Sequence, residues 1–184
     1  MNLSNVNLAE LRALIGSACH SKVTLAADTT PGQEAGVTTT GTTSYSIDGV
    51  WKTKAAIDNG QYSAGHDKVL DGYSCLFVFA LNAAGTLTTF QGLVFKVEGS
   101  KFRGYRTYTD NTGAVTGYSK ELALVDKNCA FLPDIPTGNA VIGVSKIVLS
   151  GSSGFTAGTT THIATGVTAT FSDVMALPAD TIIL

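Results

Sequence analysis

The sequence contains few charged residues, which make up only 14% of its 184 residues, while apolar residues reach 44%. Basic and acidic residues nearly balance, and the formal net charge is −2. Nucleic acid binding requires several Lys or Arg side chains on one face, and the densest basic segment, KFRGYR at 101–106, is short. The composition therefore argues against a nucleic-acid-binding protein.

Long hydrophobic runs are also lacking. A membrane span needs about 18–20 continuous apolar residues, whereas LFVFAL at 76–81 has only the length of a strand. The first 22 residues have no cationic start before their apolar part, and Glu10 and Arg12 interrupt that part. We therefore expect no membrane span and no signal peptide, and synthesis in a reducing cytoplasm.

Metal-binding and disulfide patterns are absent from the sequence. The three cysteines are far apart and include no CxxC pair: Cys19, Cys75 and Cys129. The three histidines are equally scattered: His20, His66 and His162. An odd number of distant cysteines is typical of free buried thiols, and neither residue type has metal-ligand spacing. The sequence predicts no metal and no cofactor.

Catalytic motifs are likewise missing, since neither a GxSxG elbow nor a phosphate-binding glycine loop occurs. Two carboxylates are sufficient for glycoside hydrolysis, and Asp48 and Asp71 are candidates for such a pair. Each, however, precedes a glycine, and Asp in that setting is usually a turn residue that bonds its own backbone. We predict a protein that is not an enzyme, with a small glycan hydrolase as the less favoured alternative.

The N-terminal part predicts a short amphipathic helix followed by an arm. Apolar residues recur at helical spacing from Leu8, and Asn7 with Glu10 resembles a capping box, so the helix is expected over Leu8–Ser17. The segment 28–43 is rich in Thr and Gly and is expected to be a surface loop or extended arm that cannot supply a core. We assign 1–43 to this helix and arm, and 44–184 to a β-domain.

The rest of the chain predicts antiparallel strands. Expected strands lie at 22–26, 73–81, 87–97, 102–109, 114–125, 140–150, 162–171 and 181–184, with turn residues between most of them. In SYSIDGVWKTKAA, simple alternation places Trp51 on the same face as Tyr45 and Ile47, with a turn or bulge at Gly49. The expected fold is an antiparallel β-sandwich or a jelly-roll-like barrel.

Aromatic residues offer the remaining binding signal. A sugar-stacking platform would draw on Trp51, Tyr62, Tyr73, Tyr105, Tyr108 and Tyr118. Alternation, however, places Tyr105 and Tyr108 on opposite faces of their expected strand, which favours ordinary packing over a platform.

Four segments carry a family resemblance: SYSIDGVWKTKAA, YSCLFVFALNAAGTLTTFQG, AFLPDIPTGNAVIGVSKIVL and FTAGTTTHIATGVTATFSDV. Together they resemble the small structural proteins encoded in the head-gene regions of tailed bacteriophages, over about Ser44 to Val174. The resemblance rests mainly on turn glycines, prolines and strand patterns.

The resemblance implies a virion component, most simply a capsid decoration or cement protein on the outer shell. Such a protein binds the major capsid protein and commonly forms a homotrimer. The alternative is a head-fibre or tail receptor-binding module that recognises host glycans. The candidate interface residues are Leu8, Leu11, Leu14, Ile15 and Trp51. Packing of the helical stripe onto its own domain remains an open alternative.

Overall fold

The fold is mainly β. The computed structural model describes residues 16–98, 101–105, 107–109, 115–118, 122–126, 132–133 and 135–174, and side chains within 16–96, 132–133 and 135–174. No helix occurs in these residues. The strands are β1 Ala18–Cys19, β2 Ala26–Ala27, β3 Val37–Thr38, β4 Thr43–Ile47, β5 Val50–Lys54, β6 Ser74–Asn82, β7 Leu87–Gln91, β8 Val94–Glu98, β9 Lys101–Tyr105, β10 Thr107–Thr109, β11 Val115–Tyr118, β12 Leu122–Asp126, β13 Asn139–Leu149 and β14 Val167–Asp173.

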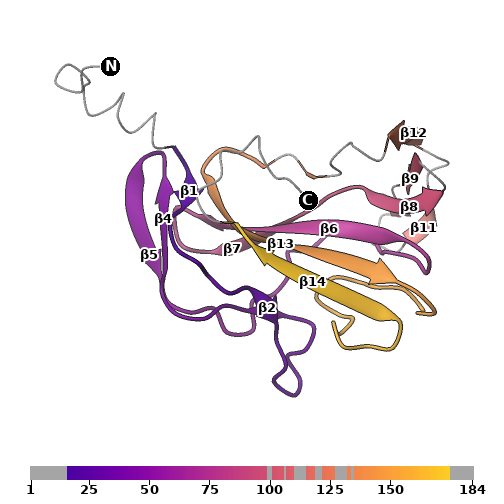
Figure 1. The fold of residues 1–184 in the computed structure, drawn as a ribbon, viewed down its shortest axis with the longest axis horizontal. Coiled ribbons are helices and arrows are strands. Elements are labelled where there is room, and N and C mark those ends of the chain that lie inside the picture. Colours follow the sequence, from indigo (N-terminus) through magenta and orange to yellow (C-terminus); the bar gives the residue numbers. More distant parts are fainter. Residues whose placement is uncertain are drawn as a thin grey trace.

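A seven-stranded antiparallel sheet dominates the structure (Figure 1), in the order β12-β9-β8-β6-β13-β14 with β7 also paired to β6. The two long strands β6 and β13 pair at its centre, from Asn139 opposite Asn82 to Val148 opposite Ser74. Their β-branched and aromatic residues suit a pleated surface. The strands expected at 73–81 and 140–150 are therefore confirmed.

Three smaller antiparallel sheets complete the described strands: β1-β4-β5, β2-β3 and β10-β11. None of the sheets closes into a barrel within the described residues, so the barrel form of the expected fold is not found there. The mainly β, antiparallel character of the fold is confirmed.

The main hydrophobic core combines side chains from the large sheet and the β1-β4-β5 sheet. Tyr45 of β4, Phe77 and Phe79 of β6, and Ile147 of β13 all belong to it, and none is more than 1% exposed. Phe155, in the turn region after β13, is also fully buried there. Residues far apart in the sequence are thus fixed around one cluster.

A second cluster lies on the opposite face of the large sheet, because successive residues of a strand point to opposite faces. It contains Leu76 and Val78 of β6, Phe95 of β8 and Val144 of β13. Since β6 is buried on both faces, its sequence is a continuous apolar run rather than an alternation of apolar and polar residues.

Several expected strands are interrupted. The segments expected at 87–97, 102–109 and 114–125 each form two strands. In the first, the chain leaves the ladder at Gly92, whose N–H donates to the carbonyl of Leu76 at 2.8 Å. The expected strand at 162–171 begins only at Val167, because residues 163–166 form turns.

The strand expected at 22–26 is mostly absent, since only Ala26 belongs to a strand. Thr24 adopts a positive φ of 50°, which breaks an extended conformation and is unusual for a β-branched residue. The N–H groups of Thr24 and Leu25 donate to the carboxylate of Asp173 at 3.0 and 2.7 Å instead of to a neighbouring strand.

Part of the arm expected at 28–43 is buried, contrary to its polar composition. Val37 is 0% exposed and belongs to the main core. The carboxylate of Asp28 accepts hydrogen bonds from the N–H groups of Thr30 and Asn59 at 2.8 and 3.1 Å. The second of these bonds holds the start of the arm against the segment around Asn59. Residues 8–15 of the expected helix lie outside the described residues, as does the strand expected at 181–184.

Candidate functional site

The β4–β5 hairpin carries the largest exposed aromatic side chain among the described residues. Trp51 is 61% exposed, although it lies within a regular strand opposite Ser46 of β4. A tryptophan exposed on a rigid element offers a large apolar contact at little cost in conformational entropy. Of the five candidate interface residues, Trp51 is therefore the one that the structure places; Leu8, Leu11, Leu14 and Ile15 lie outside the described residues.

Trp51 lies on the face of the hairpin opposite to the one that alternation predicts. Asp48 and Gly49 form a two-residue turn with φ values of 48° and 71°, as in a type I′ turn. The turn places Trp51 opposite Ser46, and directly opposite residues share a face. Tyr45 points into the core, so Trp51 points away from it.

A histidine supports one side of the indole. The rings of His20 and Trp51 stack with centroids 4.6 Å apart and an angle of 11° between their planes. His20 Nε2 lies 2.9 Å from Ser46 Oγ, and this hydroxyl donates to the carbonyl of Gly16 at 3.0 Å. Because the Ser46 hydrogen is used in this bond, Nε2–H donates to Ser46 Oγ. The chain of contacts fixes the indole orientation while Trp51 stays 61% exposed among the described residues.

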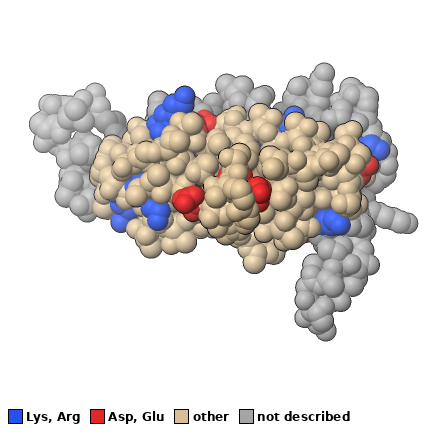
Figure 2. Space-filling view, turned by 90° about the horizontal axis from the view of Figure 1, so that it is seen from below, with Lys and Arg blue, Asp and Glu red and all other residues tan. Residues whose placement is uncertain are grey.

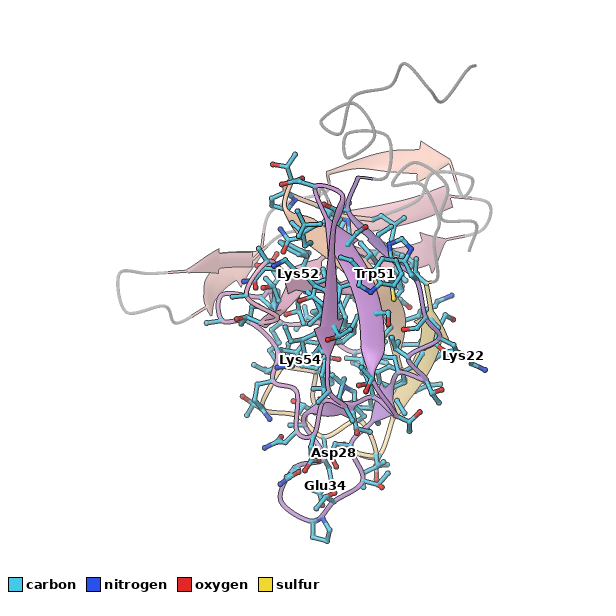
Figure 3. All side chains as sticks on the ribbon, turned by 90° about the vertical axis from the view of Figure 1, so that its left-hand side faces the viewer. Lys22, Asp28, Glu34, Trp51, Lys52 and Lys54 are labelled. Carbon is cyan, nitrogen blue, oxygen red and sulfur yellow. The ribbon has the colours of Figure 1, made fainter. Side chains whose placement is uncertain are left out.

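Two lysines lie on the hairpin and a third lies to one side of it (Figure 3). Lys52 and Lys54 lie opposite Tyr45 and Thr43 and so on the inward side of the edge strand β5, while exposed Lys22 follows β1 on the side of Trp51. The strands β1, β4 and β5 contain no Asp or Glu. The strands of the hairpin thus carry an exposed indole on one face and two lysines on the other, and the turn between them carries Asp48.

The two carboxylates considered for hydrolysis lie in separate turns. Asp48 is in the β4–β5 turn, where its N–H donates to Ser17 Oγ at 3.1 Å. Asp71 Oδ1 accepts the N–H groups of Gly151 and Ser152 at 2.7 and 3.2 Å. Asp71 therefore orders the turn after β13, a distant segment, rather than its own backbone as its LDG context predicts.

The histidines occupy three different environments. No group of three or more His, Cys, Asp or Glu side chains that could hold a metal ion occurs among the described residues. His162 is buried, its Nδ1 lies 3.0 Å from the carbonyl of Glu34, and its Nε2 lies 2.8 Å from the Tyr62 hydroxyl. The carbonyl can only accept, so Nδ1–H donates to it and Tyr62 donates to Nε2. This pair links the 31–36 and 156–166 turns to the core.

We expect the stability of the protein to fall as the pH drops from 7 to 5. Burial lowers the pKa of both His66 and His162 below the ordinary value of 6.5. Above pH 6.5 neither the folded nor the unfolded chain is protonated at these sites, so their full contribution is present. Below it the unfolded chain binds protons that the folded chain resists, until the pH reaches the folded pKa. Each histidine then lowers the free energy of unfolding by up to about 1.4 kcal/mol per pH unit.

Urea unfolding at several pH values measures this slope, and the variant His66→Gln, whose amide can still bond Thr89 Oγ1, removes one of the two titrating groups. The slope of this variant should be close to half that of the wild-type chain. An unchanged slope in the variant would show that His66 does not titrate as described.

The described cysteines have buried thiols. Burial raises the pKa of Cys75 to about 12, and burial also raises the pKa of Cys19. A protonated thiol is a poor nucleophile and metal ligand. Both cysteines are free, as their spacing predicts; Cys129 lies outside the described residues.

Neither Tyr62 nor Tyr73 extends the Trp51 surface. Tyr62 is buried in the main core and Tyr73 is half-buried beside it. Side chains of Tyr105, Tyr108 and Tyr118 are not among those described. The sequence did not identify His20 as part of this site, because only the pairing of β1 and β5 with β4 brings it to Trp51.

No protein-family profile, curated protein or solved structure matches this chain. No helix that is long and apolar enough to cross a bilayer occurs in the part of the chain that the structure describes. The fold and the Trp51 surface therefore provide the structural basis for a functional proposal.

Proposed function

We propose that this protein acts by binding rather than by catalysis, as a decoration or cement protein of a tailed-bacteriophage head. The observation that supports it is the exposed, His20-supported Trp51 on a rigid hairpin. Tryptophan is enriched among the few residues that dominate binding energy in protein interfaces. The partner in this proposal is the major capsid protein, and the location is the outer surface of the virion.

The sparse charge of the surface supports the same proposal. Figure 2 shows a face on which uncharged residues cover most of the described area, with a few separate Lys, Asp and Glu side chains. Such a surface can pack against other proteins without removing many charges from water. We also propose that the two sheets that share the main core are the layers of a β-sandwich, which would hold the hairpin rigid.

Replacing Trp51 by alanine should weaken binding of the purified chain to heads that lack it by about thirtyfold or more, since such anchors contribute roughly 2 kcal/mol or more. The measurement is co-sedimentation of the chain with the heads over a range of concentrations. The matched control is Ile163→Ala, because Ile163 is 66% exposed but lies in another turn. Equal effects of the two variants would remove Trp51 from the interface.

A second candidate function is recognition of host glycans by a head-fibre or tail module. The exposed, stacked indole favours it, because aromatic faces are common in the binding sites of small ligands. Glycan-array binding by the wild-type chain that is lost in the Trp51→Ala variant, together with no binding to heads, would favour this function over the first.

A further inference from the structure

The strand β14 forms one edge of the seven-stranded sheet. It pairs with β13 over seven residues, from Leu149 opposite Val167 to Gly143 opposite Asp173, with no register shift between the two strands. Figure 1 shows β14 in yellow at the margin of the sheet. A long, regular edge strand presents a row of backbone groups to any chain that approaches it.

The hydrogen bonds at the two ends of this pair show which groups point outward. Val174 N–H donates to Ile142 at 3.1 Å, and Ser150 N–H donates to Gly166 at 2.9 Å. In an antiparallel ladder, residues that bond the neighbour alternate with residues that do not. The even-numbered residues of β14 therefore bond β13.

The odd-numbered residues of β14 direct their backbone groups away from the sheet. Val167 N–H donates to the carbonyl of Ala164 at 3.0 Å. The Val167 carbonyl and both backbone groups of Ala169 and Phe171 have no hydrogen-bond partner within the part of the chain that the structure describes.

The β14 edge from Val167 to Phe171 carries no charge and no proline, and the contact with the 24–25 segment is made at its Asp173 end. On β5, the other long edge described here with its side chains, Lys52 and Lys54 point inward and oppose pairing with another strand. The β14 sequence, VTATFSD, contains no Lys, Arg or Pro. Its only charge is Asp173, whose carboxylate accepts the N–H groups of Thr24 and Leu25.

We propose that β14 pairs with β14 of a second copy of this chain, antiparallel about a two-fold axis that passes beside Ala169. This register places Ala169 opposite Ala169 of the partner subunit and Val167 opposite Phe171 of the partner subunit. Each Ala169 N–H donates to the other Ala169 carbonyl, and each Phe171 N–H donates to the Val167 carbonyl across the axis. The register uses the open Val167 carbonyl, whereas the Val167 N–H stays bonded to Ala164 and the Phe171 carbonyl gains no partner across the axis.

The side chains are compatible with this register. Thr168 lies opposite Thr170 of the partner subunit, and both threonines are exposed on the free chain. Threonine pairs across strands are favourable, and no like charges meet. The two-fold axis repeats each of these backbone bonds, so a second copy supplies a partner for every open group named above except the Phe171 carbonyl. The product is a dimer, distinct from the three-fold association that the resemblance implies.

Disulfide trapping tests the register directly. Ala169→Cys places two thiols on directly opposed residues with Cα atoms about 5.5 Å apart, within the range that a disulfide spans. Oxidised glutathione should then convert most of this variant to a covalent dimer on a non-reducing gel. Thr168→Cys is the matched control: its Cα atoms lie about 8 Å apart in this register, so it should stay near the wild-type background.

Sedimentation velocity tests the association itself. The wild-type chain should change from monomer to dimer as its concentration rises, because a single strand pair buries less area than a stable interface. Ala169→Pro should remain monomeric at all of these concentrations. It removes an outward N–H and no bond to β13, a position at which an edge strand tolerates proline, so its far-UV circular dichroism should match the wild-type spectrum.

The proposal is overturned if Thr168→Cys cross-links as readily as Ala169→Cys. It is also overturned if the wild-type chain stays monomeric, forms a trimer, or associates equally well when folded Ala169→Pro is used. None of these outcomes affects the proposed role of Trp51, which lies on a different sheet.

Discussion

Replacing Phe77 by alanine should lower the free energy of unfolding by about 3–5 kcal/mol, the range for deleting a buried phenylalanine side chain. Phe77 is 0% exposed, and its ring lies 5.1 Å from Tyr62, 5.4 Å from His66 and 6.1 Å from Phe155. These neighbours are held by other contacts, such as the Val69–Phe155 backbone bridge and the bonds of Tyr62 to His162 and of His66 to Thr89, so they cannot easily collapse into the space. Urea unfolding at pH 7.5 measures the change.

Phe90→Ala is the matched control for this variant. The Phe90→Ala substitution removes the same atoms as Phe77→Ala. The Phe90 side chain, however, is only partly buried, at the margin of the second cluster and opposite Val78. Its loss should cost about half as much as the loss of Phe77 or less, since it leaves a smaller cavity. A larger loss of stability in Phe90→Ala than in Phe77→Ala would place the main core on the wrong face of the sheet.

Replacing Gly166 by alanine should lower the free energy of unfolding by about 2–5 kcal/mol, the sum of two separate costs. Gly166 has a φ of +78°, a conformation that strains any residue with a Cβ. An added Cβ would also lie 2.6 Å from the carbonyl oxygen of Ser150 and 2.9 Å from the backbone nitrogen of Ser152. Backbone atoms cannot move aside as a flexible side chain can.

Gly151→Ala separates these two costs. Gly151 has nearly the same φ, +74°, but no atom lies within 4 Å of an added Cβ. The Gly151→Ala variant should therefore lower the free energy of unfolding only by the cost of the strained backbone conformation, about 1–2 kcal/mol. Thermal and urea unfolding of the two variants should differ clearly; equal losses would mean that the approach of Gly166 to the 150–152 turn is not as close as described.

The sequence was sufficient to predict the strands that are stabilised by local signals. β6 and β13 are long, β-branched or aromatic runs bounded by turn residues, and both were found where they were expected. Gly49 likewise predicted a turn or a bulge, and a two-residue turn is found there. In each of these cases the residues that decide the structure are neighbours in the chain.

The sequence was not sufficient where distant contacts decide the conformation. Nothing near Thr24 indicates its positive φ, because the Asp173 carboxylate that binds the adjacent N–H groups lies 149 residues away in the chain. Val37 was assigned to a polar arm, yet it is buried because its backbone pairs with Gly60. Local composition carries no information about either contact.

The candidate site shows the same division. Trp51 was identified from its residue type, but its face was predicted wrongly because alternation was continued through the Asp48-Gly49 turn. The turn changes the face by setting Trp51 opposite Ser46. The support from His20 depends on β4 lying between β1 and β5, a strand order that residue patterns do not reveal.

The most direct test of the proposed function is the copy number of this protein in virions purified from cells that carry its gene, measured relative to the major capsid protein by quantitative mass spectrometry. A decoration protein should be present at a ratio near one to one, or at another fixed ratio set by the symmetry of the shell. A few copies per particle would contradict this role and favour the fibre or tail alternative. Complete absence from the virion would contradict both.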